Sequence, residues 1–255
     1  MDIAKLLSEH NVVTFILLFS RMSGMMAFFP LFSYNTIPMI VKTAIAFYLT
    51  ILFFPMASND LTLNSSTILL LMMLSEFALG LIAGLALNIV FGALGIAGMQ
   101  ISMVMGFSMA TVFDPSSESN SPIISQFLTY LALLILLSFN GHHLMILFMS
   151  HAVSHLTLGH FYPHEFVWKY LSTAFKDMFT IGFILAFPII ALSLLSDLIF
   201  GMLMKTMPQF NMLVIGFPIK ITLSVAIVIA VLASMMGLFK KEFIDVFYFL
   251  KNLYL

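Results

Sequence analysis

The stretch Thr67–Phe113 reads TILLLMMLSEFALGLIAGLALNIVFGALGIAGMQISMVMGFSMATVF and decides the fold class of this chain. Its one charged residue is Glu76. A helix needs about 20 apolar residues to cross a bilayer core, so this stretch is too long for a single span and is compatible with a hairpin. Helices satisfy their own backbone hydrogen bonds in lipid, and the stretch lacks the alternation of a membrane strand. It therefore predicts helical structure in a membrane.

The composition of the whole chain indicates the same class. The chain is 62% hydrophobic and 8% charged, whereas a soluble domain carries about 25% charged residues. So few charges cannot cover a water-facing surface on 255 residues. We expect an all-α, multi-helix membrane protein whose kinked helical hairpins are covered by lipid or by partner chains. The net charge of −1 makes nucleic acid an unsuitable partner, and the lack of cysteine excludes disulfides and thiolate metal sites.

The chain divides into six apolar regions and a short tail, which we treat as one domain over residues 1–255. The tail, Lys240–Leu255, is amphipathic and fits either the membrane interface or the surface of a partner. Its basic residues Lys240, Lys241 and Lys251 place it on the cytoplasmic side under the positive-inside rule. The apolar regions are about 12–32, 39–56, 67–113, 123–148, 178–204 and 212–239.

Four charged residues lie inside the apolar regions: Arg21, Glu76, Asp197 and Lys220. Each is costly in lipid unless it is paired or solvated. Two are positive and two are negative, so one interpretation is buried ion pairs that fix the order of the helices. The other is a polar path through the helix bundle. Both interpretations require these side chains to face protein or water rather than lipid.

The segment Met99–Pro115 is rich in Met and Phe, and its helix propensity is weak from Gly106 to Phe113. A non-helical segment at membrane depth is tolerated only inside protein or beside a cavity. One interpretation is an ordinary loop, and the other is an apolar plug that closes a pore by excluding water. The small residues before it let helix backbones approach closely; they are Gly80, Gly84, Gly92, Gly95 and Gly98.

Six histidines lie between His142 and His164, and the pairs His151/His155 and His160/His164 have the i,i+4 spacing that a metal can use. The chain has no HExxH motif, and Glu165 is the one carboxylate near them. We therefore expect solvated or interfacial histidines, with no metal and no other cofactor. Catalytic-triad, P-loop and dinucleotide signatures are also missing, so we expect no catalytic residues and no enzymatic activity. An intramembrane metalloenzyme would rest on the histidines alone.

Several short motifs follow one another in a specific order. Met105–Ala110 leads to Asp114-Pro115, and Pro208–Asn211 is followed by Ile215–Lys220. Together with Arg21, Pro30–Ser33, Ser125–Leu128 and Asn140–His142, these stretches resemble the FliR family of flagellar biosynthetic proteins over nearly the whole chain. The family-specific residues of the second stretch are Pro208, Gln209, Asn211, Gly216, Pro218 and Lys220.

The resemblance implies a pore-forming, non-enzymatic subunit of the flagellar type III protein export gate, in the bacterial inner membrane at the flagellar basal body. It implies FliP- and FliQ-like sister subunits in a helical ring, FlhB- and FlhA-like export components, and unfolded flagellar proteins as passengers. It also implies that Met105–Ser121 plugs the pore. The plug residues are Met105, Gly106, Phe107, Met109, Val112, Phe113, Asp114 and Pro115.

Two other functions remain open on the sequence. The first is the equivalent subunit of a virulence injectisome, which shares the fold. The second is a small-solute transporter, which would predict an internal repeat around a binding site at the membrane midplane. We find no convincing repeat.

Overall fold

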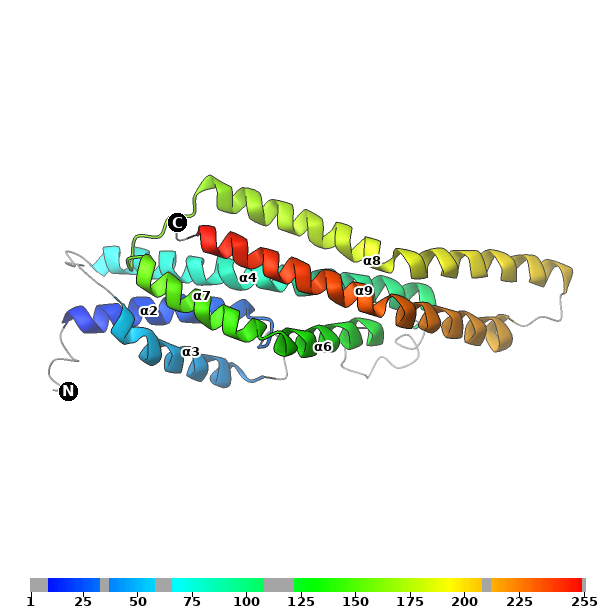
Figure 1. The fold of residues 1–255 in the computed structure, drawn as a ribbon, viewed down its shortest axis with the longest axis horizontal. Helices are drawn as coiled ribbons and strands as arrows, with labels where there is room; N and C mark the ends of the chain where they lie inside the picture. The colour runs from blue at the N-terminus through cyan, green and yellow to red at the C-terminus, as the bar shows by residue number, and fades with distance from the viewer. Residues whose placement is uncertain (1–8, 33–36, 58–65, 108–121, 208–211, 254–255) are drawn as a thin grey trace. The chain divides into compact units, whose positions relative to one another are not determined.

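The computed structural model describes residues 9–32, 37–57, 66–107, 122–207 and 212–253. All regular structure in these ranges is helical, which confirms the all-α prediction (Figure 1). In chain order the elements are α2 (Glu9–Phe28), α3 (Met39–Phe53), the 3-10 turn η1 (Phe54–Met56), α4 (Ser66–Met105), α6 (Ile123–Ser138), α7 (Gly141–His155), α8 (Glu165–Thr206), the π-helical turn η2 (Met212–Gly216) and α9 (Phe217–Asn252).

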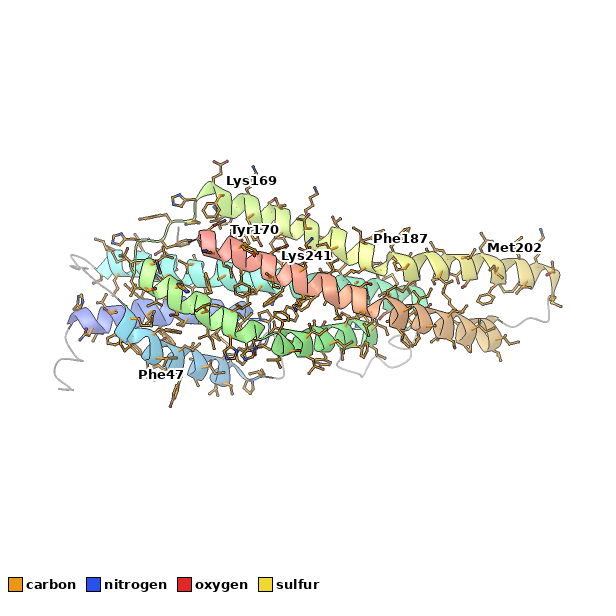
Figure 2. The ribbon with its side chains drawn as sticks, in the orientation of Figure 1. Phe47, Lys169, Tyr170, Phe187, Met202 and Lys241 are labelled. Atoms are coloured by element: carbon orange, nitrogen blue, oxygen red, sulfur yellow. The ribbon has the colours of Figure 1, made fainter. Side chains whose placement is uncertain are left out.

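Five helical segments of the described chain are long and apolar enough to cross a membrane. They are His10–Phe28, Met39–Met56, Ser66–Met105, Glu165–Thr206 and Val214–Asn252. A sixth span is formed if α6 and α7, which bend by 66° at their junction, count as one. Their outward surfaces are apolar: Phe47, Phe187 and Met202 all project away from the ribbon and are exposed (Figure 2). The chain is therefore a multi-pass membrane protein.

The stretch 67–113 does not fold as a hairpin in its described part. Residues Ser66–Met105 form one helix of 40 residues, so the hairpin interpretation is wrong there. Gly80 and Gly98 make the close helix contacts that the sequence predicted. A Cβ on Gly80 would collide with the backbone of Arg21 and Met25, and a Cβ on Gly98 would collide with the backbone of Ser125.

Two other predicted regions differ from the structure. The region 123–148 is broken at Asn140, whose φ of 58° is left-handed and therefore ends α6 before α7 begins. The tail from Lys240 is not a separate element, because α9 continues without a break to Asn252. The apolar face of this tail docks inside the chain itself, where Phe243, Val246 and Leu250 are buried.

The chain forms two compact units. Unit 1 comprises Met1–Ile89, Leu137–Ala174 and Phe243–Leu255. Its core contains Leu17 and Met22 of α2, which are at most 1% exposed. Unit 2 comprises Val90–Leu136 and Phe175–Glu242. Each unit holds one of the two ion pairs described next.

Candidate functional site

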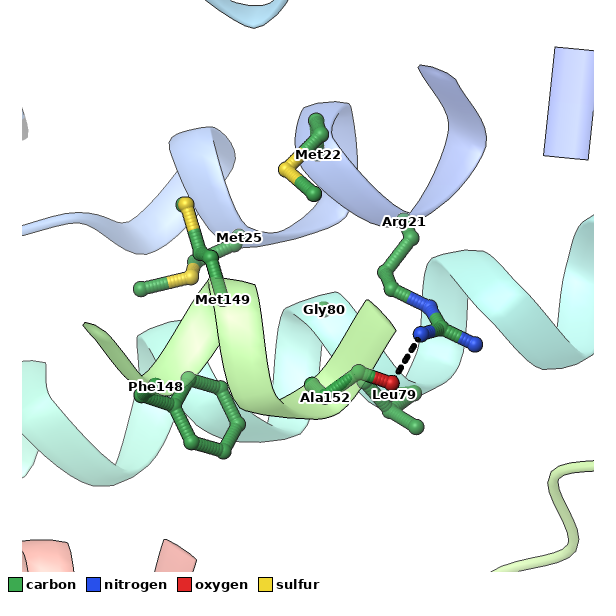
Figure 3. Close-up of a pocket in the computed structure, with 8 residues that line it drawn as sticks. All are labelled: Arg21, Met22, Met25, Leu79, Gly80, Phe148, Met149 and Ala152. Carbon is green, nitrogen blue, oxygen red and sulfur yellow. Dashed lines mark hydrogen bonds between the residues drawn. The ribbon is translucent and has the colours of Figure 1, made fainter. Parts of the chain in front are cut away.

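Arg21 and Glu76 form a fully buried ion pair in unit 1. Arg21 Nε donates to Glu76 Oε2 at 2.5 Å, and the side chains are 3% and 0% exposed. Arg21 Nη1 also donates to the carbonyl oxygen of Ala152 at 2.7 Å (Figure 3). Glu76 Oε1 accepts from the backbone N–H of Gly159 at 2.6 Å. The pair therefore joins α2, α4, α7 and the loop before α8.

Because both charges are buried, each depends on the other for its neutralisation. Removing one partner of a buried pair leaves an uncompensated charge in a low-dielectric interior and costs about 3–5 kcal/mol. Arg21 Nη2 has no hydrogen-bond partner among the described residues. The Arg21 side chain lines a cavity of about 10 Å³ together with Met22, Met25 and Phe148 (Figure 3). That volume is close to the smallest that holds one water molecule.

Asp197 and Lys220 form the second ion pair, in unit 2. Lys220 Nζ donates to both carboxylate oxygens of Asp197, at 2.7 and 2.8 Å. The Lys220 side chain is 8% exposed, whereas that of Asp197 is 42% exposed. The contact joins α8 to the first turn of α9. All four intramembrane charges of the sequence are therefore paired, as the ion-pair interpretation requires.

The predicted break at Gly106 coincides with the end of α4. The N–H of Phe107 donates to Ser102 O at 3.1 Å, and the N–H of Gly106 donates to Met103 O at 3.2 Å. These two bonds form the Schellman motif, in which a residue with positive φ closes a helix. Gly106 has a φ of 87°, which L-residues with side chains rarely adopt. The helix thus ends where a Gly-specific conformation turns the chain.

The end of α4 lies against the start of α9 in unit 2. A Cβ built on Gly106 would be 3.0 Å from Cε1 of Phe217. Ser193 Oγ on α8 donates to Val104 O at 2.9 Å, one turn of α8 before Asp197. The first residues of the predicted plug and the second family motif, Gly216–Lys220, are therefore neighbours, although more than 100 positions separate them in the sequence.

The structure describes some of the predicted plug and motif residues and not others. Met105 is fully buried, so its side chain packs inside the chain. Pro218 occupies the first turn of α9, where proline is tolerated. The remaining plug residues Met109, Val112, Phe113, Asp114 and Pro115, and the motif residues Pro208, Gln209 and Asn211, lie outside the described part of the chain.

Sequence reasoning missed the backbone groups that complete the Arg21–Glu76 network, Ala152 O and Gly159 N–H. It also missed Ser193. Backbone groups carry no residue-specific signal, and a serine in an apolar helix is common. The histidines gather in unit 1, where the rings of His151 and His155 lie 5.6 Å apart. Among the described residues, no group of three or more His, Cys, Asp or Glu side chains is placed to hold a metal.

The fold and the two ion pairs define a class: a multi-pass helical membrane protein whose intramembrane charges are neutralised between helices. The model for bacterial export proteins, family 1, matches residues 12–246. The flagellar biosynthetic protein FliR of Bacillus subtilis (strain 168) is 31% identical over 232 residues, or 90% of each chain. FliR of Escherichia coli (strain K12) is 29% identical over 234 residues, or 91% of this chain and 89% of the relative.

The chain therefore belongs to the FliR family of bacterial export proteins. A further relative, FliR of Pectobacterium carotovorum subsp. carotovorum, is 31% identical over 209 residues, which cover 81% of this chain and 79% of the relative. Family membership makes the chain a membrane component of the flagellar export apparatus, and the predicted family is confirmed.

Proposed function

We propose that this chain is a structural, pore-forming subunit of the flagellar type III export gate and that residues 105–121 close its pore. The gate passes unfolded flagellar subunits outward, and the energy for transport comes from other components. Family membership carries the proposal, because the matched region covers residues 12–246. The flagellar names of the relatives support the flagellar system over an injectisome.

The end of α4 supports the assignment of the plug. α4 stops at Met105 in a Schellman motif, and the chain leaves the helix at Gly106. This exit is fixed on three sides, by the Phe217 ring, by the hydrogen bond from Ser193 to Val104 O, and by the buried Met105 side chain. A plug requires a rigid base so that its apolar tip stays in the pore. The contacts at the end of α4 support such a base.

The apolar outer surface supports the proposed partners. Exposed Leu, Phe and Met side chains line α3 and α8, so these helices need a covering. In the proposed gate, FliP- and FliQ-like subunits provide part of it, and FlhB- and FlhA-like components deliver the exported chains. Co-purification tests this part. A gate subunit brings these chains with it, whereas a small-solute transporter purifies alone or as a homo-oligomer.

Ion leakage across the inner membrane tests the plug. The variant replaces Met109, Val112 and Phe113 with serine and retains Met105, whose burial belongs to the fold. We expect raised leakage in membranes, because polar side chains no longer exclude water from the pore. The matched control replaces Leu61 and Leu63, in another connecting segment, with serine. Equal leakage in wild type, variant and control, with the variant still assembled, would reject the plug.

The loss of the gene tests the system. Deletion in the native host should abolish the flagellar filament, and the gene supplied in trans should restore it. A deletion strain that retains its filament but loses an injectisome activity would overturn the flagellar assignment and leave the type III fold intact.

A further inference from the structure

The carboxylate of Asp197 on α8 has more acceptor sites than unit 2 fills. Lys220 Nζ contacts its two oxygens at 2.7 and 2.8 Å and is its one partner among the described residues. A carboxylate has about four acceptor sites, so about two remain open. The side chain is 42% exposed, so these open sites face outward from the unit.

The helix face that surrounds this carboxylate is apolar. Leu194, Leu198 and Met202 follow one another at i,i+4 spacing, and each is at least 60% exposed. Met202 projects away from the ribbon (Figure 2). Asp197 and Gly201 form the neighbouring row at the same spacing. A partner that covers the apolar row therefore also covers the carboxylate and removes water from it.

A covered carboxylate needs a hydrogen-bond donor from whatever covers it. Burying an acceptor without a donor is costly, and a hydrocarbon chain supplies no donor. The charge of Asp197 is already balanced by Lys220, so a second cation would leave one buried positive charge uncompensated. An uncharged donor satisfies the open acceptor sites without adding charge. Hydroxyl and amide side chains make such bonds between packed helices.

Gly201 gives a partner helix room to approach this carboxylate. It lies one turn after Asp197 and is exposed, and a Cβ built on it would have no heavy atom within 4 Å. Small residues let helix backbones come close together, so even a short side chain on the partner can reach the carboxylate.

We propose that this face of α8 binds a helix of a sister subunit, and that Ser, Thr, Asn or Gln on that helix donates a hydrogen bond to Asp197. The inference rests on the proposed gate, because the gate provides the sister subunits. It adds the site of the contact and the chemistry of the partner. The partner helix packs on Leu194, Leu198 and Met202 and approaches most closely at Gly201.

Two double variants differ in the acceptor alone. Both carry Lys220→Met, which avoids a buried unpaired ammonium; one adds Asp197→Asn and the other adds Asp197→Leu. The asparagine keeps a neutral acceptor, and the leucine has none. Each full chain is purified in detergent with its FliP- and FliQ-like subunits, and a dilution series gives the apparent dissociation constant. The leucine variant should bind about tenfold more weakly than the asparagine variant, because the partner's donor is left unsatisfied.

A second test leaves the ion pair unchanged. Gly201→Leu fills the space for close approach and should also weaken binding about tenfold, the effect of a lost hydrogen bond to a charged group. It should not lower the thermal stability of the chain freed of its subunits, since the position is exposed. The matched control is Gly237→Leu on α9, another exposed glycine with open space for a Cβ. Equal weakening by Gly201→Leu and Gly237→Leu would overturn the contact.

The remaining outcomes separate this contact from its rivals. Equal dissociation constants for the asparagine and leucine variants would overturn the proposal, since Asp197 would then face water. Equal weakening of both relative to wild type would overturn the uncharged donor, because a cationic donor needs the charge of the carboxylate. A wild-type chain that brings no sister subunits would overturn the proposed gate itself, and this contact with it.

Discussion

Replacing Glu76 with glutamine should destabilise unit 1 far more than removing an exposed charge of the same unit. The substitution retains the shape and one oxygen, which still accepts from the N–H of Gly159. It removes the only anion that contacts the 3%-exposed Arg21 guanidinium among the described residues. Breaking a buried pair on one side costs about 3–5 kcal/mol. A neutral change at the exposed Asp245, in the same unit, should cost about 0.5 kcal/mol or less.

A double-mutant cycle separates charge burial from packing. Arg21→Met alone leaves the Glu76 carboxylate buried and should again cost about 3–5 kcal/mol. Arg21→Met with Glu76→Gln removes both charges. The carbonyl of Ala152 then loses the Arg21 donor but keeps the N–H of Leu156 at 3.2 Å. The double variant should therefore cost only about 1–3 kcal/mol, well below the roughly 6–10 kcal/mol sum of the single changes.

Fluorescence during unfolding in a denaturing detergent measures these free energies. Trp168 is the one tryptophan of the chain and belongs to unit 1, so its emission reports on the unit that contains the pair. The matched control is Asp245→Asn. A double variant that loses as much stability as the two single variants together would contradict the charge-burial effect. So would a Glu76→Gln variant as stable as the control.

Three further predictions concern helix ends, close contacts and the second pair. Gly106→Ala should destabilise unit 2 by about 1–3 kcal/mol, because alanine is strained at a φ of 87°. Gly237→Ala, at a helical position with free space for a Cβ, should instead stabilise the unit by up to about 1 kcal/mol. Thermal unfolding compares the two variants. Gly80→Ala should cost about 1–3 kcal/mol by separating α2 from α4, and the measurement is the same melt. Lys220→Met should lower the free energy of unfolding in micelles by about 1 kcal/mol or less, because the Asp197 side chain is 42% exposed and can bind water instead. A loss near that of Glu76→Gln would contradict this.

The sequence predicted the helical class, the membrane location and the helix break at Gly106, because each depends on local composition. The hydrophobic content excluded a soluble domain, and the Gly-Phe step after a long helix is the local signal that a Schellman motif needs. The sequence could not decide whether Thr67–Phe113 turns back on itself. Its length fits either one long helix or a hairpin, and the choice depends on contacts with Arg21 and Ser125, which lie on other helices.

The site was predicted only in its residue types. Arg21, Glu76, Asp197 and Lys220 were identified by their cost in lipid, but the pairing of each with its partner depends on tertiary structure. Arg21 and Glu76 are 55 positions apart, and no sequence period connects them. The amphipathic tail was recognised by its pattern. Its docking on the chain itself depends on the aromatic side chains that it contacts. One of these is Tyr170, whose ring stacks on that of Phe249 with 3.4 Å between the ring centroids.

The two ion pairs differ in what completes them. Within unit 1, the carboxylate of Glu76 receives Arg21 and a backbone N–H, so the chain itself satisfies the buried anion. Asp197 receives Lys220 alone among the described residues, and its neighbours on the exposed side of α8 are apolar, including Leu194 and Leu198. A carboxylate has about four acceptor sites, and hydrocarbon supplies no donor for those left open. The surface of α8 around Asp197 must therefore face water or a donor from another chain, which the proposed gate assembly would supply.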